Sequence, residues 1–80
     1  MKFQWPDSAK AELRSIDRET AVRILEALTR YGDTGVGDVK SLQGIWSGCI
    51  RLRVGDYRVI LRVKPEEIAV LRVAHRSDAY

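Results

Sequence analysis

The chain contains little of what marks a secreted or metal-dependent protein. Among its 80 residues are one cysteine, Cys49, and one histidine, His75. A single cysteine excludes an intramolecular disulfide, which fits a reducing compartment. No metal-binding or cofactor-binding motif stands out, and we expect neither a metal nor a cofactor.

Long apolar runs are absent as well. No segment reaches the length that spans a membrane, and the first residues lack the apolar stretch of a signal peptide. We therefore expect a cytoplasmic protein with no membrane partner. A chain of 80 residues that is 45% hydrophobic predicts one domain, residues 1–80, of modest stability.

The net charge of +3 is distributed unevenly. Residues 1–40 contain as many acids as bases, so the whole positive surplus lies in residues 41–80. Arginine dominates this half; it binds phosphate in bidentate fashion and stays charged at physiological pH. The bases concerned are Arg51, Arg53, Arg58, Arg62, Arg72 and Arg76, with Lys64 as the only lysine.

The first half of the chain predicts a short strand, residues 2–5, followed by two helices. Asp7 or Ser8 is expected to cap the first helix. Asp17 is expected to cap the second, which we expect to end at Gly32. Both helices should pack on the sheet as an antiparallel hairpin through apolar residues at helical spacing, namely Ala9, Leu13 and Ile16, then Ala21, Ile24, Leu25, Leu28 and Tyr31.

The sequence Val54-Gly55-Asp56-Tyr57 predicts a hairpin with a two-residue type II′ turn. Such a turn fixes the register and places Arg53 opposite Arg58 and Arg51 opposite Ile60. One face of the hairpin should be apolar and face the helices, and the other should be basic. The apolar face comprises Ile50, Leu52, Val54, Tyr57, Val59, Leu61 and Val63, and the basic face Cys49, Arg51, Arg53, Arg58, Ile60 and Arg62.

Arg53 and Arg58 are thus predicted to be direct cross-strand neighbours, and like charges there destabilise a sheet by up to about 1 kcal/mol. No acid shares this face within the hairpin. One interpretation is a solvated surface, eased by an acid from elsewhere. We favour the other interpretation, an anion-binding face, for which nucleic acid is the obvious polyanion.

A second turn, residues 64–67, leads to a last strand, Ile68–Ala74. Both of its faces are mostly apolar, so we expect it near the centre of the sheet. The face that Arg72 takes stays open, because the turn length is not determined. Trp5 and Trp46 are expected to pack in the core or at a helix edge, although Trp46 is flanked by polar residues and is also placed to contact a partner.

Two segments together resemble the RelE/ParE family of bacterial toxins. Residues 51–60 contain Arg-x-Arg-x-Gly-Asp-Tyr-Arg, and residues 70–80 end in His-Arg-x-x-x-Tyr. Residues 38–44 are also similar to the segment before the family's first long strand. The resemblance implies an α+β fold, in which a short N-terminal strand and a two-helix antiparallel hairpin pack on a twisted antiparallel sheet.

The resemblance also implies a function. RelE-type toxins of type II toxin–antitoxin systems cleave messenger RNA in the ribosomal A site by driving the RNA's 2′-hydroxyl onto the adjacent phosphate. The implied partners are a cognate antitoxin, the ribosome with its messenger RNA, and operator DNA for the toxin–antitoxin complex. Two alternatives remain: a ParE-type inhibitor of DNA gyrase, or an inactive member that binds the antitoxin. The arginine density and the terminal tyrosine favour the RNA endonuclease, an mRNA interferase.

Site residues follow from the same resemblance. Cleavage builds negative charge on a pentavalent phosphorane, which preorganised guanidinium groups stabilise. The implied catalytic residues are Arg51, Arg53, Arg58, Arg76, Tyr80 and His75, and the expected RNA contacts are Arg51, Arg53, Arg58, Arg62 and Arg72.

The resemblance does not identify the general base. RelE has lysines at the positions of Arg51 and Arg53, and arginine effectively cannot release its proton. Proton transfer would then fall to Tyr80 or to His75, since histidine is the side chain suited to proton transfer near neutral pH. The alternative for His75 is a strand-end residue with a satisfied hydrogen bond.

Overall fold

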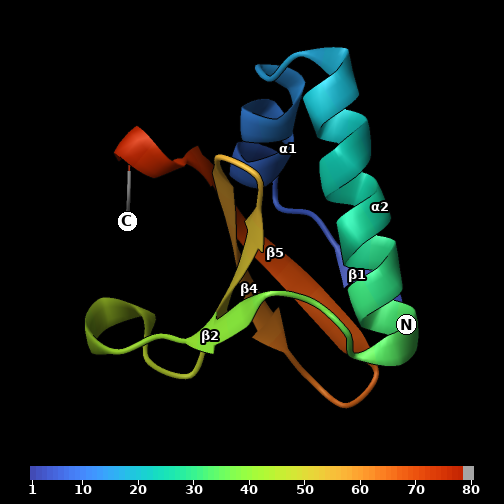
Figure 1. Ribbon diagram of the computed structural model, residues 1–80. Coiled ribbons are helices and arrows are strands. Elements are labelled where there is room, and N and C mark those ends of the chain that lie inside the picture. The colour runs from blue at the N-terminus through green and yellow to red at the C-terminus, as the bar shows by residue number, and fades with distance from the viewer. Residues whose placement is uncertain (79–80) are drawn as a thin grey trace.

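The computed structural model describes residues 1–78 as two helices packed on a five-stranded sheet (Figure 1). The α+β class predicted from the sequence is confirmed. None of the helices in this range is long and apolar enough to cross a membrane. In chain order the elements are β1 (Lys2–Gln4), α1 (Asp7–Arg14), α2 (Arg18–Thr34), β2 (Val39–Ser41), the 3-10 helix η1 (Gly44–Trp46), β3 (Ile50–Val54), β4 (Tyr57–Val63), β5 (Glu67–His75) and the 3-10 helix η2 (Arg76–Asp78).

The sheet has the strand order β1-β5-β4-β3-β2. Strands β2 to β5 are antiparallel to their neighbours, whereas β1 pairs in parallel with the first half of β5. The sheet is therefore mixed, and the antiparallel prediction holds for four of its strands. β5 lies between β1 and β4, which confirms that the last strand is internal.

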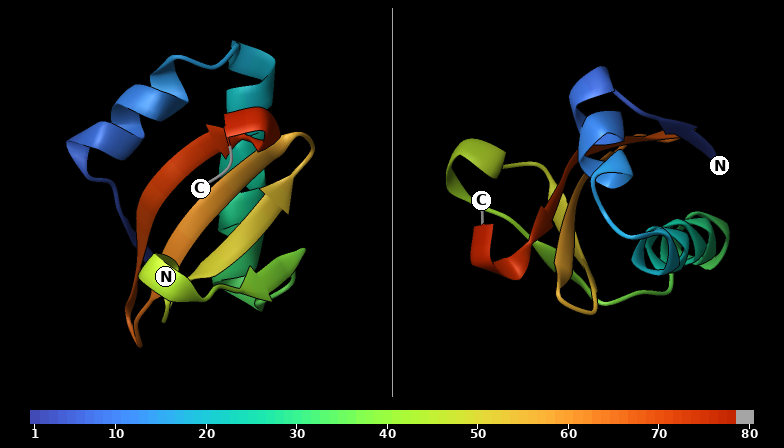
Figure 2. Two further views of the ribbon diagram at one scale, coloured as in Figure 1. Left: turned by 90° about the vertical axis from the view of Figure 1, so that its left-hand side faces the viewer. Right: turned by 90° about the horizontal axis from the view of Figure 1, so that it is seen from above.

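Both helices lie on the same side of the sheet, and of the described residues 1–78 only η1 and η2 lie over the other face (Figures 1 and 2). We call this second side the open face. The core forms between the helices and the sheet, where the predicted apolar parity of the hairpin is confirmed for its central residues. The fully buried core side chains include Ile24 from α2 and Leu52, Val59, Leu61, Ile68 and Val70 from the strands.

The start of α2 is confirmed and that of α1 is corrected. The Asp17 carboxylate accepts a hydrogen bond of 3.1 Å from the Thr20 backbone N–H and caps α2. This bond and a second one from the Thr20 hydroxyl lower the pKa of Asp17 below its usual value. The N-cap of α1 is Pro6, with no side-chain capping bond, so the prediction of Asp7 or Ser8 was wrong.

The predicted end of α2 at Gly32 was also wrong. The helix continues to Thr34 and ends at Gly35, whose φ of +74° is the left-handed conformation that favours glycine. Gly32 serves a different purpose, because a Cβ there would lie 3.0 Å from Cζ of Phe3. A missing side chain at this position lets β1 approach the helix, which sequence alone does not distinguish from a helix stop.

The register of the β3–β4 hairpin agrees with the prediction at all five pairs, Ile50–Leu61, Arg51–Ile60, Leu52–Val59, Arg53–Arg58 and Val54–Tyr57. Gly55 has a φ of +58°, and no non-glycine residue in 1–78 has a positive φ, which fits the type II′ turn. The two-residue turn therefore decides which side chains reach the open face.

Candidate functional site

The open face of the sheet holds a row of arginines above an apolar floor. Arg53 on β3 lies directly opposite Arg58 on β4, and Arg51 pairs with Ile60. Ile60 is fully buried and Cys49 is 2% exposed, although neither faces the helices. Arginine stems cover apolar surface in this way while the charged ends stay near solvent. We call Arg51, Arg53, Arg58 and Arg62 the arginine row.

Arg58 is held by its own hairpin turn. Its Nη1 donates to the carbonyl oxygens of Gly55 at 3.0 Å and Tyr57 at 3.1 Å. A guanidinium has five N–H donors, so Nε and Nη2 remain for an anion. The turn thus orients Arg58 without consuming its capacity to bind phosphate.

An acid from outside the hairpin reaches the arginine row. The Asp38 carboxylate lies 3.5 Å from Nη2 of Arg51 and 4.0 Å from Nε of Arg53. The Arg53 backbone N–H also donates to the Asp38 carbonyl at 2.9 Å. Because Asp38 and Arg53 are both more than half exposed, the ion pair between them is weak, whereas the Arg51 side chain is only 17% exposed. The two ion pairs offset part of the arginine repulsion and leave the exposed Arg53 open to a stronger anion.

Lys40 joins the same face through β2, which sequence reasoning missed. It pairs directly with Arg51 across the β2–β3 ladder. Asp38 and Lys40 are two residues apart, so on a strand their side chains would lie on one face, and this spacing was the signal in the sequence. An irregular segment that contains η1 separates β2 from β3, so the pairing of Asp38 and Lys40 with the hairpin could not be predicted from local sequence.

Arg76 is brought to the hairpin turn by η2. Its backbone N–H donates to the Asp56 carbonyl at 2.8 Å, and its Nε lies 3.8 Å from Oδ1 of Asp56. Arg58 pairs with Ala74, two residues before Arg76. Arg76 thus lies at the hairpin turn beside Asp56, and its predicted catalytic role stays a prediction.

Arg72 pairs with Ile60, so the register places it on the open-face side of β5, but its guanidinium is engaged by an acid. Its Nε and Nη2 both donate to Oε2 of Glu12 on α1, at 3.0 and 2.9 Å. Oε1 of Glu12 accepts the Val73 backbone N–H at 2.8 Å. β1 pairs only with residues 67–69 of β5. Further along β5, at Val73, the Glu12 carboxylate accepts a backbone hydrogen bond of the kind that a neighbouring strand would accept. The Arg72 guanidinium is therefore engaged in a structural contact, and its predicted contact with RNA stays a prediction.

His75 faces the helix side rather than the arginine row. It pairs with Tyr57, whose ring packs against the core, and the two rings meet edge to face at 5.3 Å between centroids. Its Nδ1 accepts the Ser77 backbone N–H at 3.1 Å and lies 2.8 Å from the Ser77 hydroxyl. A small hollow of about 210 Å³ beside it is lined by Glu12 of α1, by Ser15 and Ile16, and by residues of β4 and β5. This arrangement favours the strand-end interpretation.

The remaining predicted residues are less informative. Arg62 lies on the open face, with Nη2 3.6 Å from the Cys49 sulfur. Tyr80 lies outside the described residues, so its predicted role remains a prediction. Within residues 1–78, no group of three or more His, Cys, Asp or Glu side chains is arranged to hold a metal ion.

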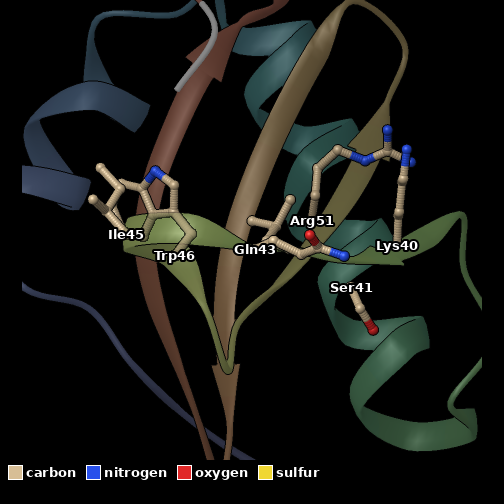
Figure 3. Close-up of a pocket in the computed structure, with 7 residues that line it drawn as sticks. Lys40, Ser41, Gln43, Ile45, Trp46 and Arg51 are labelled. Atoms are coloured by element: carbon tan, nitrogen blue, oxygen red, sulfur yellow. The ribbon is translucent and has the colours of Figure 1, made fainter.

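Trp46 does not pack in the main core, contrary to the prediction. It lies on η1 over the open face, beside a hollow of about 580 Å³ that Lys40, Gln43 and Arg51 also line (Figure 3). Ile45 projects next to it and is 92% exposed. Trp5, in contrast, is half buried against the core as predicted.

Solved structures with the same fold include proteins of toxin–antitoxin systems. The chain aligns with a chain of the RelB–RelE antitoxin–toxin complex from Methanococcus jannaschii with a TM-score of 0.76 and 22% identity, covering 95% of this chain and 93% of that one. It aligns with a YafQ mutant, H87Q, from E. coli with a TM-score of 0.81 and 11% identity, covering 99% and 97%.

A third similar structure is the RelBE2 toxin–antitoxin complex from Mycobacterium tuberculosis, with a TM-score of 0.65 and 26% identity over 94% of this chain and 96% of that one. No curated protein sequence matches the chain. The family description "ParE toxin of type II toxin-antitoxin system, parDE" matches residues 3–80. The chain belongs to this family, and it is a toxin of the type II toxin–antitoxin class.

Proposed function

We propose that this toxin cleaves messenger RNA on the ribosome, with the arginine row binding the scissile phosphate. The observation that carries the proposal is the direct pairing of Arg53 with Arg58 on the open face, with Arg51 beside them. The two arginines repel each other in the free protein, and a bound polyanion would neutralise that repulsion.

The chemistry requires no more than these side chains and a base. The 2′-oxygen of the RNA attacks the neighbouring phosphorus and gives up its proton, the bond to the 5′-oxygen breaks, and that oxygen takes a proton. A 2′,3′-cyclic phosphate remains. Arg53 and Arg58 stabilise the charge of the pentavalent intermediate. Tyr80 is the favoured base, because the His75 ring contacts Tyr57 and engages Ser77 instead of the row.

A cognate antitoxin is the proposed protein partner. Two of the similar structures are complexes of a toxin with its antitoxin, RelB–RelE and RelBE2. The antitoxin would block the basic open face, and the complex would bind operator DNA. Release of the antitoxin would then give the toxin access to the ribosome and its messenger RNA.

Inhibition of DNA gyrase is the second candidate function. Its support is the family description, which names ParE and parDE. A gyrase inhibitor acts by binding and needs no phosphate chemistry, so the arginine row would be an interface and nothing more. The two candidate functions therefore predict different damage: cleaved messenger RNA for the endonuclease and broken DNA for the gyrase inhibitor.

Induced expression followed by primer extension on a reporter message separates these candidates. We expect cuts within translated codons for the wild type, and loss of those cuts for Arg58→Ala and Tyr80→Phe. Arg30→Ala is the matched control, because Arg30 is exposed on α2 and lies away from the open face. An intact message accompanied by DNA breaks would refute the nuclease and support the gyrase inhibitor.

A further inference from the structure

We propose that the hollow beside η1 is a nucleotide-binding subsite, an inference that rests on the RNA-cleaving function proposed above. The hollow of about 580 Å³ lies between η1, β2 and Arg51 (Figure 3). Arg51 belongs both to the hollow and to the arginine row. A nucleotide in this position would therefore be a direct neighbour of a phosphate held by the row.

Two N–H groups at the hollow lack an acceptor. Nε1 of Trp46 and Nε of Arg51 are buried and have no hydrogen-bond partner among residues 1–78. Buried donors without acceptors are destabilising and are rare in native proteins. A ligand that brings acceptors would satisfy them, and nucleic acid is rich in phosphate, ribose and base oxygens.

Charge at the hollow favours the same ligand. Lys40 and Arg51 face each other across the β2–β3 ladder, and in Figure 3 both side chains extend in the same direction. Asp38 is the only acid that forms an ion pair with either of them within residues 1–78, and it is itself shared with Arg53. A phosphate between the ammonium and guanidinium groups would neutralise this excess.

The other lining residues suit a base. The Trp46 ring and the exposed Ile45 side chain offer apolar contacts of the kind on which unstacked bases rest. The Gln43 amide offers a donor and an acceptor to the edge of a base. We therefore place the phosphate between Lys40 and Arg51 and the base between Trp46 and Gln43.

Binding in this way requires η1 to shift, because Nε1 of Trp46 is covered in the free protein. The backbone provides for such a shift. Gly44 and Gly48 flank Trp46 with φ values of +69° and +88°, and no side chain would contact a Cβ at either position. Glycine has no Cβ and adopts a wider range of backbone angles than other residues, so the chain can change direction more easily at these two positions.

An acidic peptide is the competing ligand, since carboxylates also supply acceptors and negative charge. The observations favour the nucleotide, because the hollow continues into the arginine row through Arg51 and contains an amide and an aromatic ring. A peptide needs neither of these two groups.

The inference is tested by nuclear magnetic resonance on the ¹⁵N-labelled full chain. The sequence has two tryptophans, so the spectrum contains two indole N–H signals, from Trp5 and Trp46. The probe is a short 2′-O-methylated oligoribonucleotide, which binds without being cleaved. We expect the Trp46 signal to shift and to exchange more slowly with solvent, while the Trp5 signal stays in place.

Two variants sharpen this test. Lys40→Gln should weaken oligonucleotide binding several-fold, because one phosphate contact is lost. Lys64→Gln, at the exposed turn before β5, is the control and should bind like the wild type. Ile45→Ala removes a side chain that is 92% exposed, so it should weaken binding without affecting folding.

The failures are distinguishable. If the oligonucleotide shifts the Nε signals of Arg53 and Arg58 but not the Trp46 indole, the subsite is wrong and the proposed RNA contact stands. If no signal moves, the subsite is wrong, and the cleavage assay on ribosomes decides the proposed function separately. If only a glutamate-rich peptide moves the Trp46 indole, the hollow is a protein interface and the nucleotide inference is overturned.

Discussion

Arg53 and Arg58 face each other across the β3–β4 hairpin, yet each guanidinium has a different local partner. Arg58 donates to the carbonyl oxygens of its own turn, whereas Arg53 lies 4.0 Å from the carboxylate of Asp38. The fold thus tolerates two like charges at directly opposed positions by engaging each with a separate group. Like charges at directly opposed positions still lower the stability of the hairpin, and the same two arginines belong to the proposed RNA site.

Replacing one member of the pair should separate stability from function. Arg53→Thr removes the repulsion and introduces a residue that strands favour, so the unfolding free energy should be unchanged or higher by up to about 1 kcal/mol. RNA cleavage should fall by roughly 10²-fold or more, as when one transition-state donor is removed. Urea unfolding and a cleavage assay measure the two effects. A variant that is less stable and fully active would contradict this interpretation.

Asp38 should restrain the affinity of the arginine row for RNA. Asp38→Asn removes the negative charge near Arg51 and Arg53, so we expect binding of a short RNA to strengthen by roughly threefold or more, with a steeper salt dependence. Fluorescence anisotropy at several salt concentrations gives both quantities. Weaker binding by the variant would mean instead that Asp38 is needed to position the two guanidinium groups.

The contact between Glu12 and Arg72 should stabilise the fold. Glu12→Ala removes the acceptor for both Arg72 and the Val73 backbone N–H, and should lower the unfolding free energy by about 1–3 kcal/mol, toward the lower value because the pair is partly exposed. A double-mutant cycle with Arg72→Met, followed by urea unfolding, isolates the pair. Additive effects of the two substitutions would show that the side chains are not coupled.

The N-cap of α2 gives the fold a pH dependence at the acidic end. Because folding lowers the pKa of Asp17, its carboxylate contributes stability fully above the ordinary aspartate pKa of about 3.9 and loses it as the pH falls through the folded-state value. Asp17→Asn should therefore differ from the wild type most at neutral pH, with the difference shrinking below about pH 4. Thermal unfolding at several pH values measures it; a constant difference would contradict the assignment.

The hairpin was predictable because local rules determine it completely. A Gly-Asp turn and strict alternation fix which residues face each other, and the structure reproduces that register. The end of α2 was not predictable in the same way, since Gly32 and Gly35 look alike in sequence. Their difference lies in the contact of Gly32 with Phe3 and the positive φ of Gly35.

The site was predictable only where it lies on the hairpin. Lys40 and Asp38 reach the arginine row through the pairing of β2 with β3, which spans an irregular segment and has no local signature. The ladder between β4 and β5 contains an irregularity at Ile60/Leu61, next to the position where Arg72 pairs. Counting residues along the last strand therefore could not assign Arg72 to a face, and its contact with Glu12 is a property of the tertiary fold.

The proposed role of the arginine row in RNA cleavage can be measured with purified toxin and ribosomes loaded with a defined messenger RNA. We predict cleavage in the A-site codon, a 2′,3′-cyclic phosphate on the upstream fragment, and a rate that Arg58→Ala lowers by about 10²-fold or more while Arg30→Ala leaves it unchanged. An intact message with wild-type toxin, or an equal rate for Arg58→Ala, would contradict the account.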